Sequence, residues 1–148
     1  CMEGCDDDPV VKRVIERMTS LSGIPFNNFE SLQLVRYKTG QFYEQHHDNP
    51  EIHFTSSFGP RILTIFLYLN DVTSGLEIGG ETEFHYLNFT ATPKKGMALV
   101  WPSVMDNLEK MDDWTWHKAL PVEKGVKYGA NAWIHLRDYQ NKQDNCTL

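Results

Sequence analysis

The sequence predicts a single, mainly β domain with one flanking helix (an α+β chain), built as a β-sandwich or barrel whose mouth holds the functional site. Three observations support this prediction. The chain has 148 residues, of which 41% are hydrophobic, enough for one domain (residues 1–148) with a buried core. One helical pattern lies near the N-terminus. Short β-type runs, separated by turn residues, fill most of the chain after Pro25.

The helical pattern covers about residues 9–22. Asp8 suits the N-cap, Pro9 suits the first turn and Gly23 can end the helix. Apolar side chains recur at helical spacing, so one face should pack against the sheet. They are Val10, Val11, Val14, Ile15, Met18 and Leu21. We expect this helix only to support the sheet.

Six β-type runs predict a β-core over about residues 31–138. The runs are 32–37, 41–48, 61–70, 81–87, 97–102 and 127–139, with turn residues at 38–40, 74–80 and 93–96. The longest apolar run is far too short to span a membrane, so no membrane segment is expected.

Charge and cysteine usage narrow the classes of function. The net charge of −6 disfavours nucleic-acid binding, which usually needs a basic face. Cys1, Cys5 and Cys146 form no C-x-x-C pair, so a zinc knuckle is not expected. Because the chain opens on Cys1 and not on Met, we expect it to be truncated at its N-terminus.

The stretch "YEQHHDNP" at residues 43–50 is a candidate metal site. Side chains alternate between the faces of a strand, so His46 and Asp48 share a face and His47 points to the other side. His46 and Asp48 are therefore the predicted chelating pair. We expect His47 to lie outside or behind the ligands, and its loss to leave metal binding nearly intact.

A third ligand must come from elsewhere in the chain. His53 lies in a loop and His85 has no second ligand nearby, whereas His117 begins a late β-run between two tryptophans. Two imidazoles and one carboxylate suit Fe(II) oxygenases, and they suit hydrolytic zinc as well. Lys127, in the same late segment, favours iron because its ammonium could hold a dianionic cosubstrate chelated to the metal.

Five stretches resemble, in order, the catalytic domain of collagen-type prolyl 4-hydroxylases, which are Fe(II)- and 2-oxoglutarate-dependent oxygenases. They are "YKTGQFYEQHHD", "RILTIFLYLND", "GGETEF", "PKKGMALVW" and "HKALPVEKGVKYGANAWIH". The resemblance covers about residues 9–137. It implies a double-stranded β-helix, a cupin-like jelly-roll, with helices packed on one side.

The resemblance also implies roles for particular residues. The iron ligands are His46, Asp48 and His117, in agreement with the alternation argument. The 2-oxoglutarate site is Lys127, at the far carboxylate, with Tyr37, Thr82 and Tyr68 as helpers. The peptide contacts are Tyr43, Arg61, Trp133 and His135. Tyr43 and His46 are an odd number of positions apart, so a bulge must intervene if both face the metal.

The function implied by the resemblance is hydroxylation of peptidyl proline at C4. O2 and 2-oxoglutarate would be consumed, succinate and CO2 released, and ascorbate would act as reductant. The expected partner is a proline-containing peptide in the secretory pathway, within the endoplasmic reticulum lumen; a partner subunit stays open. Two alternatives also stay open: an oxygenase acting on another side chain or a small molecule, and a degenerate jelly-roll that binds peptide without turnover.

The chain departs from the family pattern in two places that bear on the substrate. Lys118 and Leu120 replace the small residue and the cysteine that usually follow the distal histidine. The N-terminal strand that commonly precedes the helix is missing.

Overall fold

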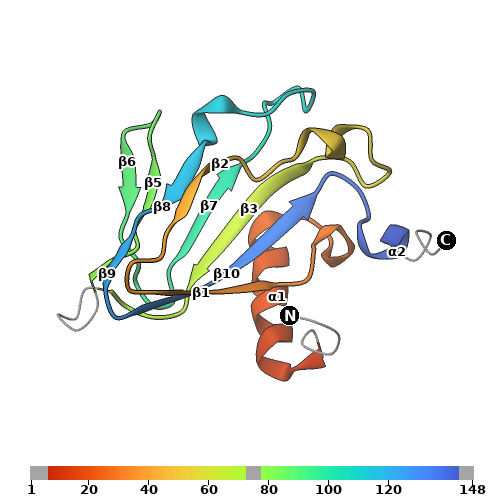
Figure 1. Cartoon of the computed structure of the whole chain (residues 1–148). Helices are drawn as coiled ribbons and strands as arrows, with labels where there is room; N and C mark the ends of the chain where they lie inside the picture. The colour runs from red at the N-terminus through yellow and green to blue at the C-terminus, as the bar shows by residue number, and fades with distance from the viewer. Residues whose placement is uncertain (1–6, 73–77, 144–148) are drawn as a thin grey trace.

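Two four-stranded antiparallel sheets form the body of the fold, which a computed structural model describes for residues 7–72 and 78–143 (Figure 1). The larger sheet has the order β1 (Gln33–Lys38), β10 (Val126–His135), β3 (Arg61–Tyr68) and β7 (Ala98–Pro102). The smaller sheet has the order β2 (Tyr43–His46), β8 (His117–Ala119), β5 (Thr82–Phe84) and β6 (Phe89–Ala91). A third, two-stranded sheet pairs β4 (Ile78–Gly79) with β9 (Val122–Lys124). The predicted mainly β class and its jelly-roll arrangement are confirmed.

Helix α1 (Pro9–Ser22) begins and ends where the sequence predicts. The Asp8 carboxylate accepts hydrogen bonds from the backbone N–H groups of Val10 and Val11, at 2.7 and 3.3 Å. Gly23 adopts the left-handed conformation (φ 69°), and its N–H donates to the Thr19 carbonyl at 2.9 Å. Local capping chemistry therefore accounts for both ends of the helix.

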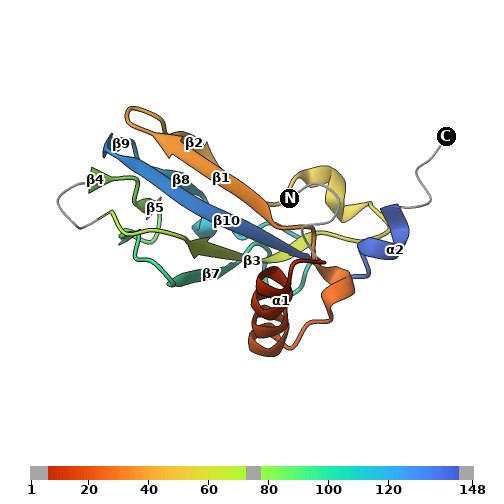
Figure 2. The same cartoon turned by 90° about the horizontal axis from the view of Figure 1, so that it is seen from below.

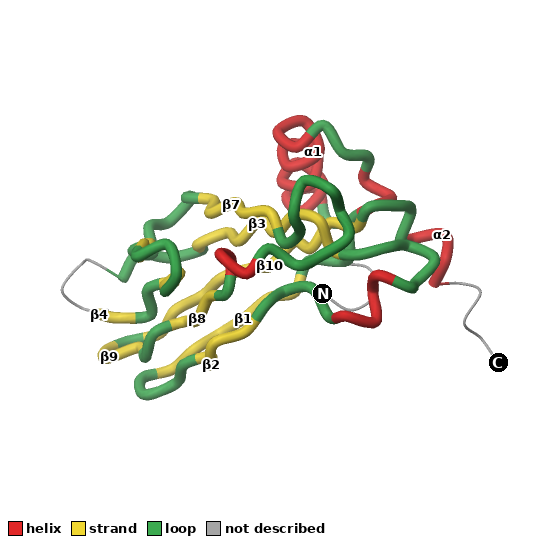
Figure 3. Tube along the Cα trace, turned by 90° about the horizontal axis from the view of Figure 1, so that it is seen from above, coloured by secondary structure: helices red, strands yellow, loops and turns green. Residues whose placement is uncertain are grey.

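The helix covers one face of the larger sheet, while β2 and β8 lie on the other side of that sheet (Figures 2 and 3). Ile15 and Met18 are buried against sheet residues that include Ile65 and Ile134. The apolar face of the helix is narrower than predicted, because Val10 and Leu21 are 57% and 68% exposed.

The remaining helices are short and lie in connections: η2 (Phe26–Asn28), η3 (Glu51–Phe54), η4 (Asp113–Thr115) and α2 (Gln140–Gln143). Among the described residues, none of the helices combines the length and the apolar character needed to cross a membrane.

Alternation along β3 and β10 gives the larger sheet two different faces. Ile65 and Ile134 face α1, whereas Phe66, Lys127 and Trp133 face the smaller sheet. The Phe66 ring lies directly over Gly129, where a Cβ would meet Phe66 Cζ at 2.3 Å. A glycine is required there because any Cβ would overlap the tip of the ring.

Four strand predictions differ from the structure in extent, and the run 61–70 is a strand only to Tyr68. The run 41–48 is a strand only to His46, and the run 127–139 only to His135. The run 81–87 contains β5 and then a turn, in which Asn88 has φ 49°, and the following strand β6 was not predicted. The three cysteines and most of the predicted turn 74–80 lie outside the described residues.

Candidate metal centre and active-site cleft

A cleft of about 510 Å³ lies between the larger and the smaller sheet and receives side chains from both. Lining residues from the larger sheet include Tyr37, Phe66, Trp101, Lys127, Asn131 and Trp133. Lining residues from the smaller sheet and its connections include Tyr43, His46, Asp48, Thr82 and His117. Most of the residues that the sequence singled out therefore meet in one cavity.

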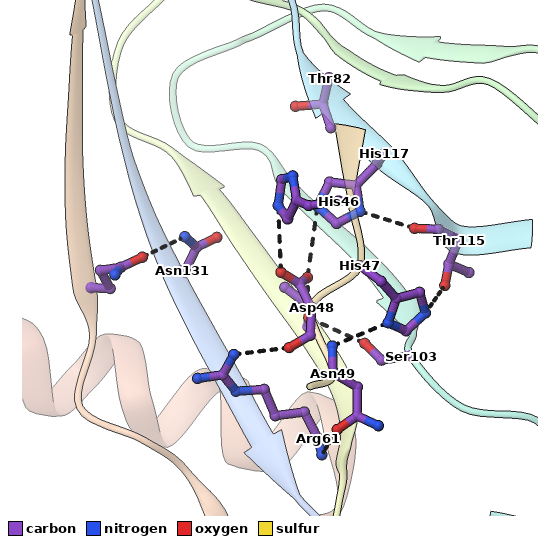
Figure 4. A network of polar contacts seen from close by, with 12 residues as sticks. His46, His47, Asp48, Asn49, Arg61, Thr82, Ser103, Thr115, His117 and Asn131 are labelled. Atoms are coloured by element: carbon purple, nitrogen blue, oxygen red, sulfur yellow. Dashed lines mark hydrogen bonds and ion pairs between the residues drawn. The ribbon is translucent and has the colours of Figure 1, made fainter. Parts of the chain in front are cut away.

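His46, Asp48 and His117 converge in this cleft, and one ligand atom from each lies within 4.8 Å of the others. His46 Nε2 is 3.8 Å from Asp48 Oδ1, and His117 Nε2 is 3.8 Å from Asp48 Oδ2 (Figure 4). These separations are too long for hydrogen bonds and leave the three groups facing a common point. Within the described part of the chain, no other cluster of three histidine, cysteine or acidic side chains has this spacing.

Backbone carbonyls orient both imidazoles toward that point. His46 Nδ1 lies 2.7 Å from the Glu44 carbonyl and His117 Nδ1 lies 2.9 Å from the Thr115 carbonyl, so each Nδ1–H donates. The Nε2 lone pair of each ring is then free to bind a metal. Burial lowers the pKa of His117 and favours its neutral, ligating form.

Asp48 is held by Thr64, which the sequence did not point to, and by Arg61, which was predicted only as a peptide contact. The Thr64 hydroxyl donates to Asp48 Oδ2 at 2.7 Å, and Arg61 Nη1 donates to the Asp48 backbone carbonyl at 2.8 Å. Both Asp48 and Thr64 are buried. The hydrogen bond on one carboxylate oxygen leaves the other, Oδ1, available to an ion. No local signal could have identified Thr64, since only the fold brings β3 beside Asp48.

The structure supports the predicted His46–Asp48 pairing for a different reason from the one predicted. Strand β2 ends at His46, so Asp48 reaches the cleft through the bend that follows the strand and not through alternation along it. The predicted bulge is present, because the pairing of β2 with β8 shifts between Tyr43 and His46. The rings of these two residues lie 4.1 Å apart.

Lys127 is an unpaired cation in the wall of the cleft. Its side chain is 1% exposed, and the described residues give it no hydrogen bond or ion pair. Its ammonium is surrounded by the rings of Tyr37, Phe66 and Tyr68, at 5.6, 5.2 and 5.6 Å from their centroids. Burial lowers the pKa of Lys127 to about 8, although the nearby Glu81 carboxylate acts in the opposite direction. A buried ammonium without a partner fits an anionic ligand.

Thr82 and Tyr68 form a hydrogen-bonded pair beside Lys127. The Tyr68 hydroxyl donates to Thr82 Oγ1 at 2.7 Å, which leaves the Thr82 hydroxyl proton free to point into the cleft. Tyr68 is 1% exposed, and burial raises its pKa to about 12. Thr82 lines the cleft and Tyr68 lies behind it.

Comparison with known families identifies the arrangement of two imidazoles, one carboxylate and one buried cation. Residues 32–135 match the profile of the 2OG-Fe(II) oxygenase superfamily. The chain belongs to this superfamily. Membership resolves the choice between iron and zinc in favour of iron, with 2-oxoglutarate (2OG) as cosubstrate.

Individual relatives of this oxygenase carry more specific names. The chain is 38% identical over 135 residues to prolyl 4-hydroxylase subunit alpha-2 of Gallus gallus, covering 89% of this chain and 24% of that protein. It is 35% identical over 147 residues to subunit alpha-1 of Rattus norvegicus, covering 96% of this chain and 26% of that protein. The chain thus spans about a quarter of the length of these two relatives.

A solved structure is similar over most of its length. The viral collagen prolyl hydroxylase of Paramecium Bursaria Chlorella virus-1, in complex with 2OG, superposes with a TM-score of 0.77 at 30% identity. The match covers 91% of this chain and 76% of that one.

The residues of this oxygenase fit Fe(II) and 2OG on their own chemistry. Two imidazoles and one carboxylate on one side of a cavity form the facial set that non-haem iron uses. The unpaired Lys127 ammonium is the group that a second, distal carboxylate requires. The specific assignment of each ligand remains a prediction.

The residues predicted to contact peptide divide into two groups. Tyr43, Arg61 and Trp133 line the cleft, with the Arg61 guanidinium stacked 3.9 Å from the centroid of the Trp133 ring. His135, by contrast, is fully buried, and its Nε2 lies 2.8 Å from Glu30 Oε1. In this structure His135 is therefore behind the cleft, and its contact with peptide stays a prediction.

Glu30 is a further residue that the sequence did not indicate. Its carboxylate accepts from Arg61 Nε at 2.6 Å and from Arg61 Nη2 at 3.1 Å, in addition to His135. Burial raises the pKa of Glu30, but the hydrogen bonds from His135 and Arg61 outweigh it and lower the pKa overall. The three side chains form a partly buried polar network that fixes Arg61 against Trp133.

Proposed function

We propose that this oxygenase hydroxylates peptidyl proline at C4, with 2OG and O2 as cosubstrates. The observation that carries the proposal is one cleft in which the His46–Asp48–His117 cluster, the unpaired Lys127 and exposed aromatic surface lie together. The named relatives, both prolyl 4-hydroxylase subunits, support proline as the target.

When bound, Fe(II) and 2OG supply the oxidising chemistry: O2 is consumed, 2OG becomes succinate and CO2, and one oxygen atom enters a C–H bond of the substrate. The protein contributes binding and orientation. His46, Asp48 and His117 would hold the ion on one side and leave the opposite side open to the cleft. Thr64 would keep the Asp48 carboxylate in one orientation through its hydrogen bond.

Lys127 would pair with the distal carboxylate of 2OG in a pocket that is nearly closed to water. The Thr82 hydroxyl, oriented by Tyr68, would donate a second contact, and Tyr37 a third. Burial raises the pKa of Tyr37, so its hydroxyl remains protonated and able to donate at neutral pH.

Tyr43 and Trp133 would form the walls that receive the proline ring. Tyr43 is 52% exposed at the mouth of the cleft, where its ring contacts that of His46. Proline-rich peptides adopt an extended polyproline II shape without a partner, and aromatic surfaces bind this shape at low entropic cost.

The proposal is tested by incubating the protein with Fe(II), 2OG, ascorbate and a panel of peptides, and measuring succinate and peptide mass together. The panel contains collagen-like repeats, other proline-rich repeats and matched peptides with each proline replaced by alanine. We expect a one-oxygen mass gain only in proline-containing peptides, equimolar succinate, and 4-hydroxyproline after acid hydrolysis.

Other results would select an alternative. Succinate formed without any peptide mass gain indicates an oxygenase with a different substrate, such as a small molecule. Peptide binding without succinate in the presence of bound iron indicates a binding module. A His46→Ala variant is the control for adventitious iron chemistry, since it should form no succinate.

A further inference from the structure

We infer that His47 is a positioning residue that clamps the two ligand-bearing segments together, so that the metal site is preassembled before the ion binds. The inference rests on the proposed metal site. It departs from the sequence-based expectation that His47 points away from the ligands and can be lost at little cost.

The backbone pairing that joins these segments is sparse at the metal end. Strands β2 and β8 pair through Tyr43 with Ala119 and His46 with His117, with a bulge between the two pairs. Strand β2 ends at His46 and β8 begins at His117. The ladder therefore stops at the ligands themselves, and nothing in it restrains the chain that carries Asp48.

His47 makes its contacts just beyond the end of this ladder. Its Nδ1 accepts from the Asn49 backbone N–H at 3.1 Å, so its proton is on Nε2. Nε2 lies 3.2 Å from the Thr115 hydroxyl oxygen (Figure 4) and 3.2 Å from the Asp112 carbonyl oxygen. The Thr115 hydroxyl donates its own proton to the Asp112 carbonyl at 2.8 Å and is therefore free to accept from His47.

Thr115 passes this restraint to a metal ligand. Its backbone carbonyl accepts from His117 Nδ1 at 2.9 Å, and this bond sets the orientation of the ligating ring. The His47 ring also packs edge-on against Trp116, 5.9 Å between centroids. A continuous set of contacts thus runs from the bend after His46, through His47 and Thr115, to His117.

The physical consequence concerns the metal-free protein. Without His47, the contacts among the described residues that still join the bend carrying Asp48 to the segment carrying His117 are the two β2–β8 pairs and contacts from β3. Metal binding would then have to order the two segments, and that cost reduces affinity. Loss of a group that orients metal ligands typically weakens metal binding by about 10- to 100-fold.

Two substitutions at His47 separate the clamp from the local bend. In His47→Asn, the amide oxygen lies near the position of Nδ1 and can still accept from Asn49, but the side chain is too short to reach Thr115. In His47→Gln, the amide nitrogen extends to the position of Nε2 and can donate to Thr115. His85→Asn is a matched control, because the His85 side chain is 66% exposed in a turn away from the site.

Co(II) titration of the metal-free proteins, followed by visible absorption, measures affinity without turnover. We expect His47→Asn to bind Co(II) about 10- to 100-fold more weakly than the wild type and to lose it faster to a chelator. His47→Gln should recover most of the affinity, and His85→Asn should match the wild type.

A merely structural role gives a different pattern. His47→Asn with wild-type Co(II) affinity overturns the inference, whether or not its melting temperature falls. If His47→Asn does not fold, Thr115→Val removes the hydroxyl that accepts from His47. The Asp112 carbonyl remains as a partner of His47, so wild-type Co(II) affinity in that variant contradicts the path from His47 through Thr115 to His117. Failure of the wild-type protein to bind Co(II) at all would count against the proposed metal site and not specifically against the clamp.

Discussion

Replacing Lys127 with methionine should raise the stability of the ligand-free protein and weaken its binding of 2OG. Lys127→Met keeps the length and apolar stem of the side chain and removes only the charge. Because the described residues give the ammonium no ion pair, its burial destabilises the protein without 2OG. With 2OG bound, the same charge is needed by the distal carboxylate. The variant should therefore be more stable when ligand-free and much weaker in 2OG binding.

The gain in stability of the ligand-free variant follows from the pKa of Lys127. Lowering the pKa of Lys127 from 10.5 to about 8 corresponds to about 3 kcal/mol against the charged form. Between about pH 8 and 10.5 the unfolded chain holds more protons than the folded one, so the free energy of unfolding rises with pH in this range. At pH 7 Lys127 is charged in both states, and the full cost of burying its ammonium is present. Removing it should raise the melting temperature by several degrees, at about 2–4 °C per kcal/mol.

The loss of 2OG affinity follows from the distal carboxylate of 2OG, which has no partner in the variant. Breaking a largely buried ion pair costs about 3–5 kcal/mol, which is on the order of a hundredfold or more in the dissociation constant of 2OG. Thermal melting of the metal-free protein and calorimetric titration with 2OG measure the two effects on one preparation. Lys95→Met, at an exposed lysine, is the control. Unchanged 2OG affinity would remove Lys127 as the anchor, and a lower melting temperature would mean that its ammonium has a partner in the ligand-free protein.

Four further outcomes are expected. In the wild type, the dissociation constant of 2OG should increase as pH rises above about 8, because Lys127 loses its proton there in the ligand-free protein; a flat profile from pH 7 to 9.5 would contradict this. His46→Ala should abolish Co(II) binding and succinate formation, and retained metal would exclude His46 as a ligand. Thr64→Val removes a hydrogen bond to a buried carboxylate, worth about 1.5–3 kcal/mol, and should weaken Co(II) binding about 10-fold or more while Asp48 still ligates. Trp133→Ala should keep slow, peptide-independent succinate formation but lose peptide hydroxylation. Losing such an aromatic wall costs about 2 kcal/mol or more of peptide binding. A folded variant that still hydroxylates peptide normally would exclude Trp133 from the substrate site.

The sequence by itself determined the features that depend on neighbouring residues. The limits of α1 follow from Asp8, Pro9 and Gly23, whose capping interactions act within one turn of the helix. The sequence also showed His46 and Asp48 as candidate metal ligands and Lys127 as a candidate partner for a dianion, because these roles follow from the chemistry of the side chains. His117 was selected among the remaining histidines by its place in a late β-run, and the resemblance to known hydroxylases added the jelly-roll arrangement and the residues of the 2-oxoglutarate and peptide sites.

The tertiary structure decided what depends on contacts between distant segments. It ended β2 at His46, so that a bend and not strand alternation brings Asp48 into the cleft. It placed Thr64 on the Asp48 carboxylate and buried His135 against Glu30. It also gave His47 partners from the segment that carries His117. Residue type and local periodicity do not specify such partners, because each of these contacts forms only when strands far apart in the chain pair and close the cleft between two sheets.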